Sequence, residues 1–287
     1  LFVSREPVRV LGSRGSGSTE FEKPRAVAVS PVDSTLVVID RLGRVQVFNP
    51  KGEFVREWLM PQIEKGTPSG CSIDKHNRLV IADTHYHRIL VFDLEGKQLA
   101  AFGSYGRGEG ELVYPTDVVC DDRGNYFVVE YGGSDRVVQF SPAGRFVEQW
   151  GRNGFDEGEF QRPMSIALHG DRLYVADSCN HRIQVFDLDG QLLDVLGGLG
   201  SEPGQFRYPY DLAVDGKGNI YVCEYGNHRV QKLSPDGKAL TQWGGKPGRE
   251  PGTFLSPWGV AIDPAGRLIV ADTMNFRVQV FAIGKSR

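Results

Sequence analysis

The amino-acid sequence predicts an all-β protein, and three observations lead to that fold class. An apolar run, an acidic residue, a short polar turn, an arginine and a second apolar run recur six times along the 287 residues. Glycine contributes 36 residues and proline 16, which favours many tight turns and few long helices. No window shows a convincing 3.6-residue period, so helix content should be near zero. The prediction is a six-bladed β-propeller with four-stranded antiparallel blades.

The six copies are evenly spaced along the chain. Their acidic residues lie 43, 47, 47, 47 and 48 residues apart. A period of about 40 to 50 residues is typical of propeller blades, in which each repeat is one sheet. The six acidic residues are Asp40, Asp83, Glu130, Asp177, Glu224 and Asp272.

Each copy contains four strand signals, which we name a to d in chain order. Strand a follows a proline, as in 25–30, 116–121, 210–215 and 258–263. Strands b and c flank the acid–turn–arginine segment and form a hairpin. Strand d ends in an aromatic or aliphatic residue, often before glycine. These strand-d residues are Trp58, Phe102, Trp150, Leu196 and Trp243.

The two ends of the chain complete one blade between them. The last copy stops at 281–287, after strand c, whereas 7–12 supplies a spare strand before the first copy. We expect this N-terminal strand to pair with strand c of the last blade, because the pairing covers a sheet edge and closes the ring. The prediction is a single propeller domain over 1–287.

Composition and charge narrow the class of protein. A 40% hydrophobic and 24% charged chain with net charge −3 and pI near 6.1 is typical of a globular protein, not of a disordered tail or a basic nucleic-acid-wrapping domain. No apolar run is long enough for a transmembrane helix, so we predict no membrane insertion, and a monomer. The chain begins with Leu1 and not with methionine. Together with the compact, uninterrupted repeats, this suggests an extracytoplasmic or secreted location, and a cytoplasmic location is also open.

Short motifs carry a family resemblance. The segments Asn180–Phe186 (NHRIQVF) and Asn227–Gln231 (NHRVQ) resemble the NHL repeat, as do the G-x-x-G-x-x-x-G-x-F stretches Gly151–Phe160 and Gly197–Phe206. The resemblance covers all six copies and implies a six-bladed NHL propeller. NHL propellers serve as RNA binders, protein-interaction modules, sensor-kinase ectodomains and one class of lyase, so the resemblance alone implies no single function.

Residues that recur in every copy are expected to serve the blade. The acid–arginine pairs should brace each b–c hairpin through charge-assisted hydrogen bonds. The glycine-rich stretches are interpreted as d-to-a connections, because no GxxxxGK[ST] motif occurs and no helix follows. His87, His181 and His228 share one repeat position with Phe276, which favours a hairpin role over a ligand role. The four cysteines form no CxxC pair and are interpreted as small buried residues.

Residues that do not recur are the candidates for function. In a propeller the b–c turns and the starts of the a strands lie on one face, around the central channel. Exposed aromatic side chains beside charged ones are typical of a binding face. The predicted ligand-binding face consists of Arg25, Arg41, His85, Tyr86, His87, Asp117, Tyr131, Cys179, Tyr210, Asp211, Tyr225, Trp258 and Met274.

Two subsets of these residues suggest metal chemistry. Blades 3 and 5 pair Asp117 with Glu130–Gly132, which contains Tyr131, and Asp211 with Glu224–Gly226, which contains Tyr225. These acid–tyrosine sites are suited to a hard cation or a cationic ligand, but common descent of the two blades is the favoured explanation. His85, Cys179 and Met274 share one repeat position and form a soft ligand set suited to copper. Hairpins two blades apart should lie about 15 Å or more from one another, compared with ligand distances near 2 Å. We therefore assign no metal, no cofactor and no catalytic residue.

Three functions follow as hypotheses. The NHL lyases, peptidyl-hydroxyglycine amidating enzymes, take zinc-binding histidines from the position after the strand-a proline. That position holds no histidine in this chain, but Arg25, Ser69, Thr116, Met164, Tyr210 and Trp258. An RNA-binding face would need clustered lysine and arginine, so nucleic acid is an unlikely partner. The leading hypothesis is a non-catalytic scaffold that recognises a protein, a peptide or a small polar ligand; a metal-dependent enzyme and an RNA-binding domain are the alternatives.

Overall fold

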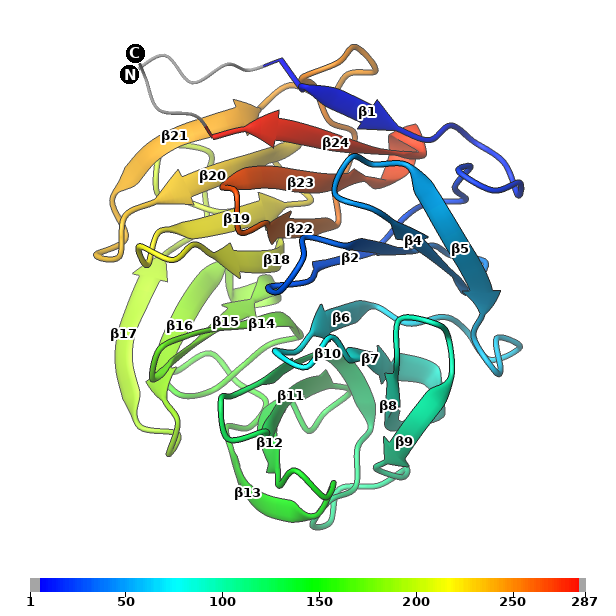
Figure 1. Cartoon of the computed structure of the whole chain (residues 1–287). Helices are drawn as coiled ribbons and strands as arrows, with labels where there is room; N and C mark the ends of the chain where they lie inside the picture. The colour runs from blue at the N-terminus through cyan, green and yellow to red at the C-terminus, as the bar shows by residue number, and fades with distance from the viewer. Residues whose placement is uncertain (1–5, 284–287) are drawn as a thin grey trace.

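The structure is a computed structural model that describes residues 6–283. Within this range the chain forms six four-stranded antiparallel sheets arranged radially, like the blades of a propeller (Figure 1). Strand a of each blade lies innermost and strand d outermost. The predicted fold class is confirmed; of the predicted 1–287 domain, residues 1–5 and 284–287 lie outside the described range.

The blades are numbered in chain order. Blade 1 contains β2 (Ala26–Val29), β3 (Leu36–Ile39), β4 (Arg44–Phe48) and β5 (Phe54–Leu59); blade 2 contains β6 (Gly70–Ile73), β7 (Leu79–Asp83), β8 (Arg88–Phe92) and β9 (Gln98–Phe102); blade 3 contains β10 (Tyr114–Cys120), β11 (Tyr126–Tyr131), β12 (Arg136–Phe140) and β13 (Phe146–Trp150). Blade 4 contains β14 (Pro163–His169), β15 (Arg172–Asp177), β16 (Arg182–Asp187) and β17 (Leu192–Gly197); blade 5 contains β18 (Pro209–Val214), β19 (Ile220–Glu224), β20 (Arg229–Leu233) and β21 (Ala239–Gly244); blade 6 contains β22 (Gly259–Ile262), β23 (Arg267–Asp272), β24 (Arg277–Ala282) and β1 (Arg9–Leu11).

The N-terminal strand closes the ring as predicted. β1 pairs antiparallel with β24, with Arg9 opposite Val280 and Leu11 opposite Val278. The Val8 amide extends the ladder by donating to the Val280 carbonyl at 2.8 Å. In Figure 1 the blue first strand lies along the red last one. Blade 6 therefore joins the two ends of the chain.

The core lies between the blades. Every side chain of β3 is buried, because each strand face packs on a different neighbouring blade. Val37 and Ile39 join an apolar cluster with blade 2, whereas Leu36 and Val38 join one with blade 6. Burial of each such side chain contributes about 1.5 to 3 kcal/mol. The continuous Val/Ile/Leu runs in the sequence reflect this two-sided burial.

The outer strands share a bulge. In β5 the register shifts between Phe54, which is opposite Phe48, and Arg56, which is opposite Val47, so Val55 is the extra residue and is exposed. A bulge twists an edge and hinders pairing with another chain. The extra residue is aliphatic and exposed in all five blades whose strand d follows strand c directly: Val55, Leu99, Val147, Leu193 and Leu240.

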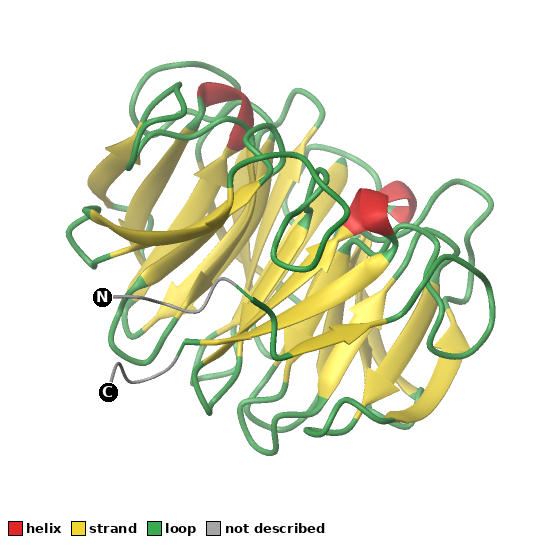
Figure 2. Cartoon of the chain, turned by 90° about the horizontal axis from the view of Figure 1, so that it is seen from above, coloured by secondary structure: helices red, strands yellow, loops and turns green. Residues whose placement is uncertain are grey.

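One face of the ring carries the b–c turns. Three of these turns contain a single turn of 3-10 helix, at Thr84–Tyr86, Ser178–Asn180 and Thr273–Asn275. Figure 2 shows these helical turns on the same side of the molecule. They are the helical segments of residues 6–283, close to the near-zero helix content predicted. In that range, no helix has the length and apolar character needed to cross a membrane.

Candidate functional site

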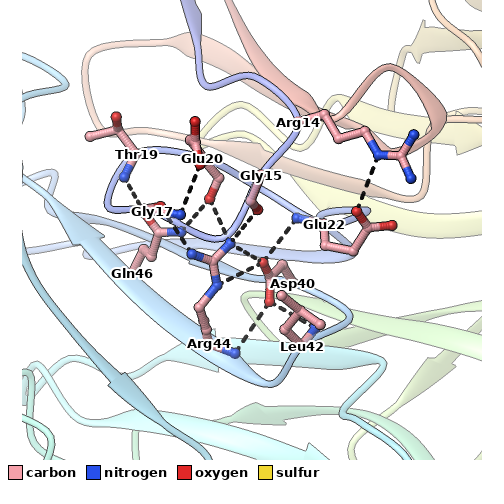
Figure 3. Close-up of polar contacts among 10 residues, drawn as sticks. All are labelled: Arg14, Gly15, Gly17, Thr19, Glu20, Glu22, Asp40, Leu42, Arg44 and Gln46. Carbon is pink, nitrogen blue, oxygen red and sulfur yellow. Dashed lines mark hydrogen bonds and ion pairs between the residues drawn. The ribbon is translucent and has the colours of Figure 1, made fainter.

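In five of the six blades the acid–arginine pair holds a glycine-rich loop, whereas in blade 2 Arg88 donates to the Gln62 side chain. In blade 1 the Arg44 guanidinium donates to Asp40 Oδ2 at 2.7 Å and to the backbone carbonyls of Gly17 and Gly15 at 2.9 and 3.0 Å (Figure 3). Asp40 Oδ2 also accepts from the Glu22 amide at 3.0 Å. The predicted brace is thus confirmed, and it extends beyond the hairpin to the d-to-a connection.

The same pairs occur in the other blades. Nε of Arg182 donates to Asp177 at 2.7 Å, and its Nη2 donates to the Glu159 carbonyl at 2.8 Å. Burial raises the pKa of the Asp177 carboxyl, and the arginine and neighbouring hydrogen bonds oppose that shift. In five blades the acid also accepts from a backbone amide of the d-to-a connection and so has structural partners. In blade 2, Asp83 Oδ2 accepts from Arg88, and the buried Asp83 Oδ1 has no hydrogen-bond partner among residues 6–283. The other pairs are Asp83–Arg88, Glu130–Arg136, Glu224–Arg229 and Asp272–Arg277.

The repeated histidine position connects adjacent blades. His181 and His228 adopt left-handed backbone conformations with φ of 57° and 53°. Nδ1 of His181 accepts from the Tyr208 amide at 3.1 Å, and Nδ1 of His228 accepts from the Ser256 amide at 2.9 Å. The equivalent His87 contacts the Val113 carbonyl through Nδ1. His87, predicted on the binding face, therefore contacts the segment that leads into the next blade.

Asp117 and Asp211 lie in the wall of the central channel. Each is two residues after its strand-a proline, and each reaches the next blade around the ring. Asp117 Oδ2 accepts from the Ile166 amide of blade 4 at 3.1 Å, and Asp211 Oδ2 accepts from the Val260 amide of blade 6 at 2.7 Å. These two predicted site residues therefore clasp neighbouring inner strands.

Ser165 continues the clasp between blades 4 and 5. Its hydroxyl donates to Asp211 Oδ1 at 2.7 Å and accepts from the Leu212 amide at 3.2 Å. Burial, followed by the charge of Asp211, raises the pKa of Asp117 well above its usual range. Burial raises the pKa of Asp211 to about 7. Both aspartates line a channel cavity of about 230 Å³ bounded by strand a of all six blades.

Four predicted residues converge at the channel mouth, above these aspartates. Tyr210 stacks on Tyr225 with ring centroids 4.8 Å apart and meets the Trp258 ring edge to face at 4.7 Å. The Arg25 guanidinium lies over the Trp258 ring at 4.7 Å. We call Arg25, Tyr210, Tyr225 and Trp258 the Trp258 group. Its members come from blades 5, 6 and 1 and bring together residues that are far apart in the sequence.

A second set of rings lies at the blade 3 side of the mouth. Tyr131 stacks on Tyr114 at 5.2 Å, and the Arg162 guanidinium lies over the Tyr131 ring at 5.2 Å. We call Tyr114, Tyr131 and Arg162 the Tyr131 group. The sequence reasoning found Tyr131 but missed Tyr114 and Arg162. Both directly precede a strand-a proline, so the position before the proline was the signal that could have identified them.

The two groups are electrostatically connected through Arg25. Burial and the nearby charge of Arg41 lower the pKa of Arg25, whereas the phenols of Tyr131, Tyr210 and Tyr225 oppose that shift. Arg25 is only half exposed. Within residues 6–283, no carboxylate forms an ion pair with Arg25, Arg41 or Arg162. The mouth thus combines aromatic surface with uncompensated positive charge.

The remaining predicted residues lie apart from this assembly or at its edge. The Tyr86 hydroxyl donates to Glu64 at 2.9 Å, so this ring packs on the loop before blade 2. His85 lies near Tyr114, with ring centroids 6.0 Å apart. Cys179 is half-buried and burial raises the pKa of its thiol, whereas Met274 is exposed at the tip of its turn.

The described residues contain no cluster suited to a metal ion. No group of three or more histidine, cysteine, aspartate or glutamate side chains in residues 6–283 has the geometry to hold one. His85, Cys179 and Met274 each occupy the middle of a 3-10 turn, on three different blades. The mouth is suited to binding through cation–π contacts, stacking and hydrogen bonds from phenols and guanidinium groups.

Comparison with known protein families agrees with the repeat pattern. The family model of the NHL repeat matches residues 254–281. The family model of the SMP-30/gluconolactonase/LRE-like region matches residues 163–247. Both matches fall within the six-bladed ring.

Several curated proteins are similar in sequence. Protein brain tumor of Drosophila melanogaster is 26% identical over 177 residues, covering 58% of this chain and 17% of that protein. Peptidylglycine alpha-amidating monooxygenase of Rattus norvegicus is 36% identical over 134 residues, covering 42% and 14%. NHL repeat-containing protein 3 of Mus musculus is 33% identical over 197 residues, covering 62% and 56%. The chain thus spans between 14% and 56% of the length of these relatives.

Solved structures share the fold at low sequence identity. A gluconolactonase from Xanthomonas campestris superimposes with a TM-score of 0.70 at 19% identity, covering 91% of this chain and 86% of that one. A streptogramin B lyase gives a TM-score of 0.65 at 11% identity, covering 97% and 88%. The chain thus has a match to the NHL-repeat family model, relatives that carry NHL repeats and six four-stranded blades, and is similar to the NHL-repeat β-propellers.

Proposed function

We propose that this propeller is a non-catalytic recognition module and that the mouth of its central channel binds the ligand. The observation that carries the proposal is the half-buried Arg25 guanidinium stacked on Trp258 with no carboxylate partner in residues 6–283. Holding a cation partly out of water without a counter-charge costs free energy. A bound ligand that pairs with Arg25 would offset that cost.

The uniqueness of the mouth residues supports the proposal. The position after the strand-a proline holds six different residue types, including Arg25, Tyr210 and Trp258. A blade does not need these side chains, because the other copies form the same sheet without them. Aromatic and arginine side chains dominate binding energy at recognition sites. The ligand is a peptide, a protein segment or a small polar molecule that reaches these rings.

The alternatives differ in what they require of the same face. A zinc lyase of the amidating type requires histidines after the strand-a prolines, and the Trp258 group occupies three of those positions with arginine, tyrosine and tryptophan. RNA binding requires many phosphate contacts, whereas the Trp258 and Tyr131 groups together contain only two cations, Arg25 and Arg162. Neither alternative explains the stacked rings as directly as ligand recognition does.

A thermal-shift screen tests the proposal. The protein would be heated with a panel of small acids, amines, sugars, short peptides and RNA oligomers, beside Trp258→Ala and the control Phe155→Ala, an exposed aromatic on a glycine-rich loop. We expect a stabilising ligand whose effect is lost in Trp258→Ala and kept in Phe155→Ala. Stabilisation that persists in Trp258→Ala, or chemical turnover of the bound compound, would contradict the proposal.

A further inference from the structure

We infer that the channel mouth binds a carboxylate carried on a flat apolar body, such as an aromatic acid. The inference rests on the proposed function, because it specifies the ligand class for the same mouth. It follows from the juxtaposition of Arg25 and Arg41 with the ring faces of the Trp258 and Tyr131 groups. Each step depends on a separate observation.

The first step is charge. Most buried or half-buried arginines of the described chain have an acidic partner, such as Arg136 with Glu130 and Arg277 with Asp272. Arg25 is the exception: it is half-buried and has no ion-pair partner within residues 6–283, and the exposed Arg41 and Arg162 are not ion-paired there either. Two like charges close together without a counter-ion favour an anion between them.

The second step concerns the acids below the mouth, which do not supply that anion. The Asp117 carboxylate accepts hydrogen bonds from the amides of Val118 and Ile166, and the Asp211 carboxylate accepts from Leu212 and Val260. Their oxygens are thus directed at the inner strands. Burial also raises the pKa of both groups, which reduces the negative charge that they carry near neutral pH.

The third step is the geometry of the donors. The Arg25 guanidinium lies over the Trp258 ring, with its central carbon 4.7 Å from the ring centroid. A planar guanidinium matches the two oxygens of a carboxylate in a bidentate arrangement. The phenols of Tyr131, Tyr210 and Tyr225 influence the pKa of the same guanidinium, and a phenol hydroxyl can donate a hydrogen bond to an anion.

The fourth step is the apolar surface. Tyr131, Tyr210, Tyr225 and Trp258 are all half-buried, so each ring keeps a part of its surface open to a ligand. Offset and edge-to-face contacts between rings contribute beyond simple burial. An aromatic carboxylate can pair with the guanidinium and pack on the rings at the same time. Acetate can only pair with the guanidinium, and benzamide can only pack on the rings.

The test is a separate titration of the protein with benzoate, benzamide, acetate and inorganic phosphate. Binding is monitored through the NMR signals of the indole N–H groups. The chain has four tryptophans, and only Trp258 belongs to the mouth. We expect benzoate to move the Trp258 signal saturably, with acetate and benzamide at least tenfold weaker. Arg25→Gln should weaken benzoate at least tenfold and Arg25→Lys less, whereas Arg145→Gln, on an exposed c–d turn, should bind as the unaltered protein does.

Each other result has a defined meaning. Benzamide binding as tightly as benzoate, or benzoate binding unchanged in Arg25→Gln, would overturn the carboxylate assignment. Phosphate binding more tightly than benzoate would overturn it in favour of a phosphate ester. In these cases the proposed function would still hold if binding of the neutral or phosphorylated ligand required Trp258, because the mouth would still be the recognition site. Melting curves of the Arg25 variants distinguish loss of binding from loss of fold.

Discussion

Asp211 Oδ2 accepts a hydrogen bond from the backbone amide of Val260, one blade further around the ring, at 2.7 Å. Asp117 makes the equivalent contact to blade 4 at 3.1 Å. Between them, Ser165 connects blades 4 and 5. The side of the channel from blade 3 to blade 6 is therefore joined by polar clasps at one level of the inner strands, and each of the three clasps includes the titratable carboxyl of Asp117 or Asp211.

The clasp predicts a pH dependence of stability. The folded state binds a proton on Asp211 more tightly than the unfolded chain does, because burial raises the pKa from 3.8 to about 7. The contribution of this group therefore favours folding most at low pH, declines as the pH rises from about 4 to 7, and then levels off. Asp211→Asn mimics the protonated form and should lack this decline, which is about 2 to 4 kcal/mol.

The measurement is urea unfolding of the two proteins between pH 4.5 and 8. The comparison uses the difference between them, because the other carboxylates titrate in both. Asp236→Asn, at an exposed surface position, is the matched control and should track the unaltered protein. Parallel stability curves for Asp211→Asn and the unaltered protein would refute a raised pKa at Asp211.

The buried acid–arginine pair of blade 5 predicts a second effect. Arg229 Nε donates to Glu224 at 2.6 Å, and its Nη2 donates to the Gln205 carbonyl at 2.8 Å. Arg229→Met removes both contacts and leaves a buried carboxylate without its cation, which should cost about 3 to 5 kcal/mol in the free energy of unfolding. Denaturant unfolding measures this loss.

A double variant separates the charge from the loop contacts. Glu224→Gln combined with Arg229→Met leaves no buried charge, so part of the stability should return. The part that does not return measures the hydrogen bonds from Arg229 to the glycine-rich loop. A double variant no more stable than Arg229→Met would show that the uncompensated charge of Glu224 is not the source of the loss.

The sequence was sufficient to predict the fold because the repeat encodes it. The spacing of the six acids gave the blade number, and the spare segment 7–12 gave the closure now seen between Val10 and Gln279. The acid–arginine brace was also predictable, since a buried charge needs a partner. The contacts of Arg44 with the Gly15 and Gly17 carbonyls were not predictable, because every residue has a backbone carbonyl and such acceptors therefore leave no pattern in the sequence.

The candidate site was predictable only in part. Position in the repeat placed Tyr210, Tyr225 and Trp258 on one face, but their mutual stacking depends on side-chain directions. Tyr86 shares that face and turns to Glu64 instead. Asp211 was expected to face a ligand, and it clasps Val260 because the inner strands approach closely enough for a side chain to span them. Such choices depend on packing between blades, which one repeat does not reveal.

Close approach of the inner strands gives a third prediction. Gly70 is the blade 2 residue at the repeat position of Asp117, and a Cβ added there would lie 2.5 Å from the Thr116 carbonyl oxygen and 2.5 Å from Asp117 Oδ1. Gly70→Ala should therefore destabilise the protein by about 1 to 3 kcal/mol. Gly216→Ala, where a Cβ would meet nothing within 4 Å, is the control. Equal melting temperatures for the two variants would contradict this packing.

Closure by the N-terminal strand gives the last prediction. Leu11 packs in the apolar cluster between blades 6 and 1, and β1 covers the edge of β24. Deleting residues 1–12 removes this side chain and about three ladder hydrogen bonds, which should cost about 3 to 6 kcal/mol in the free energy of unfolding. The freed edge of β24 should also promote association of the truncated chains, which light scattering measures.

Deleting only residues 1–5 provides the matched control, because it keeps Glu6, Val8 and the whole of β1. This shorter deletion should melt close to the full chain and stay dispersed, since the Val8 amide still donates to Val280 at 2.8 Å. If the longer deletion were as stable as the shorter one, β1 would contribute nothing to closure. Contacts between β2 and β22, which line the channel at the same seam, would then have to hold the ring alone.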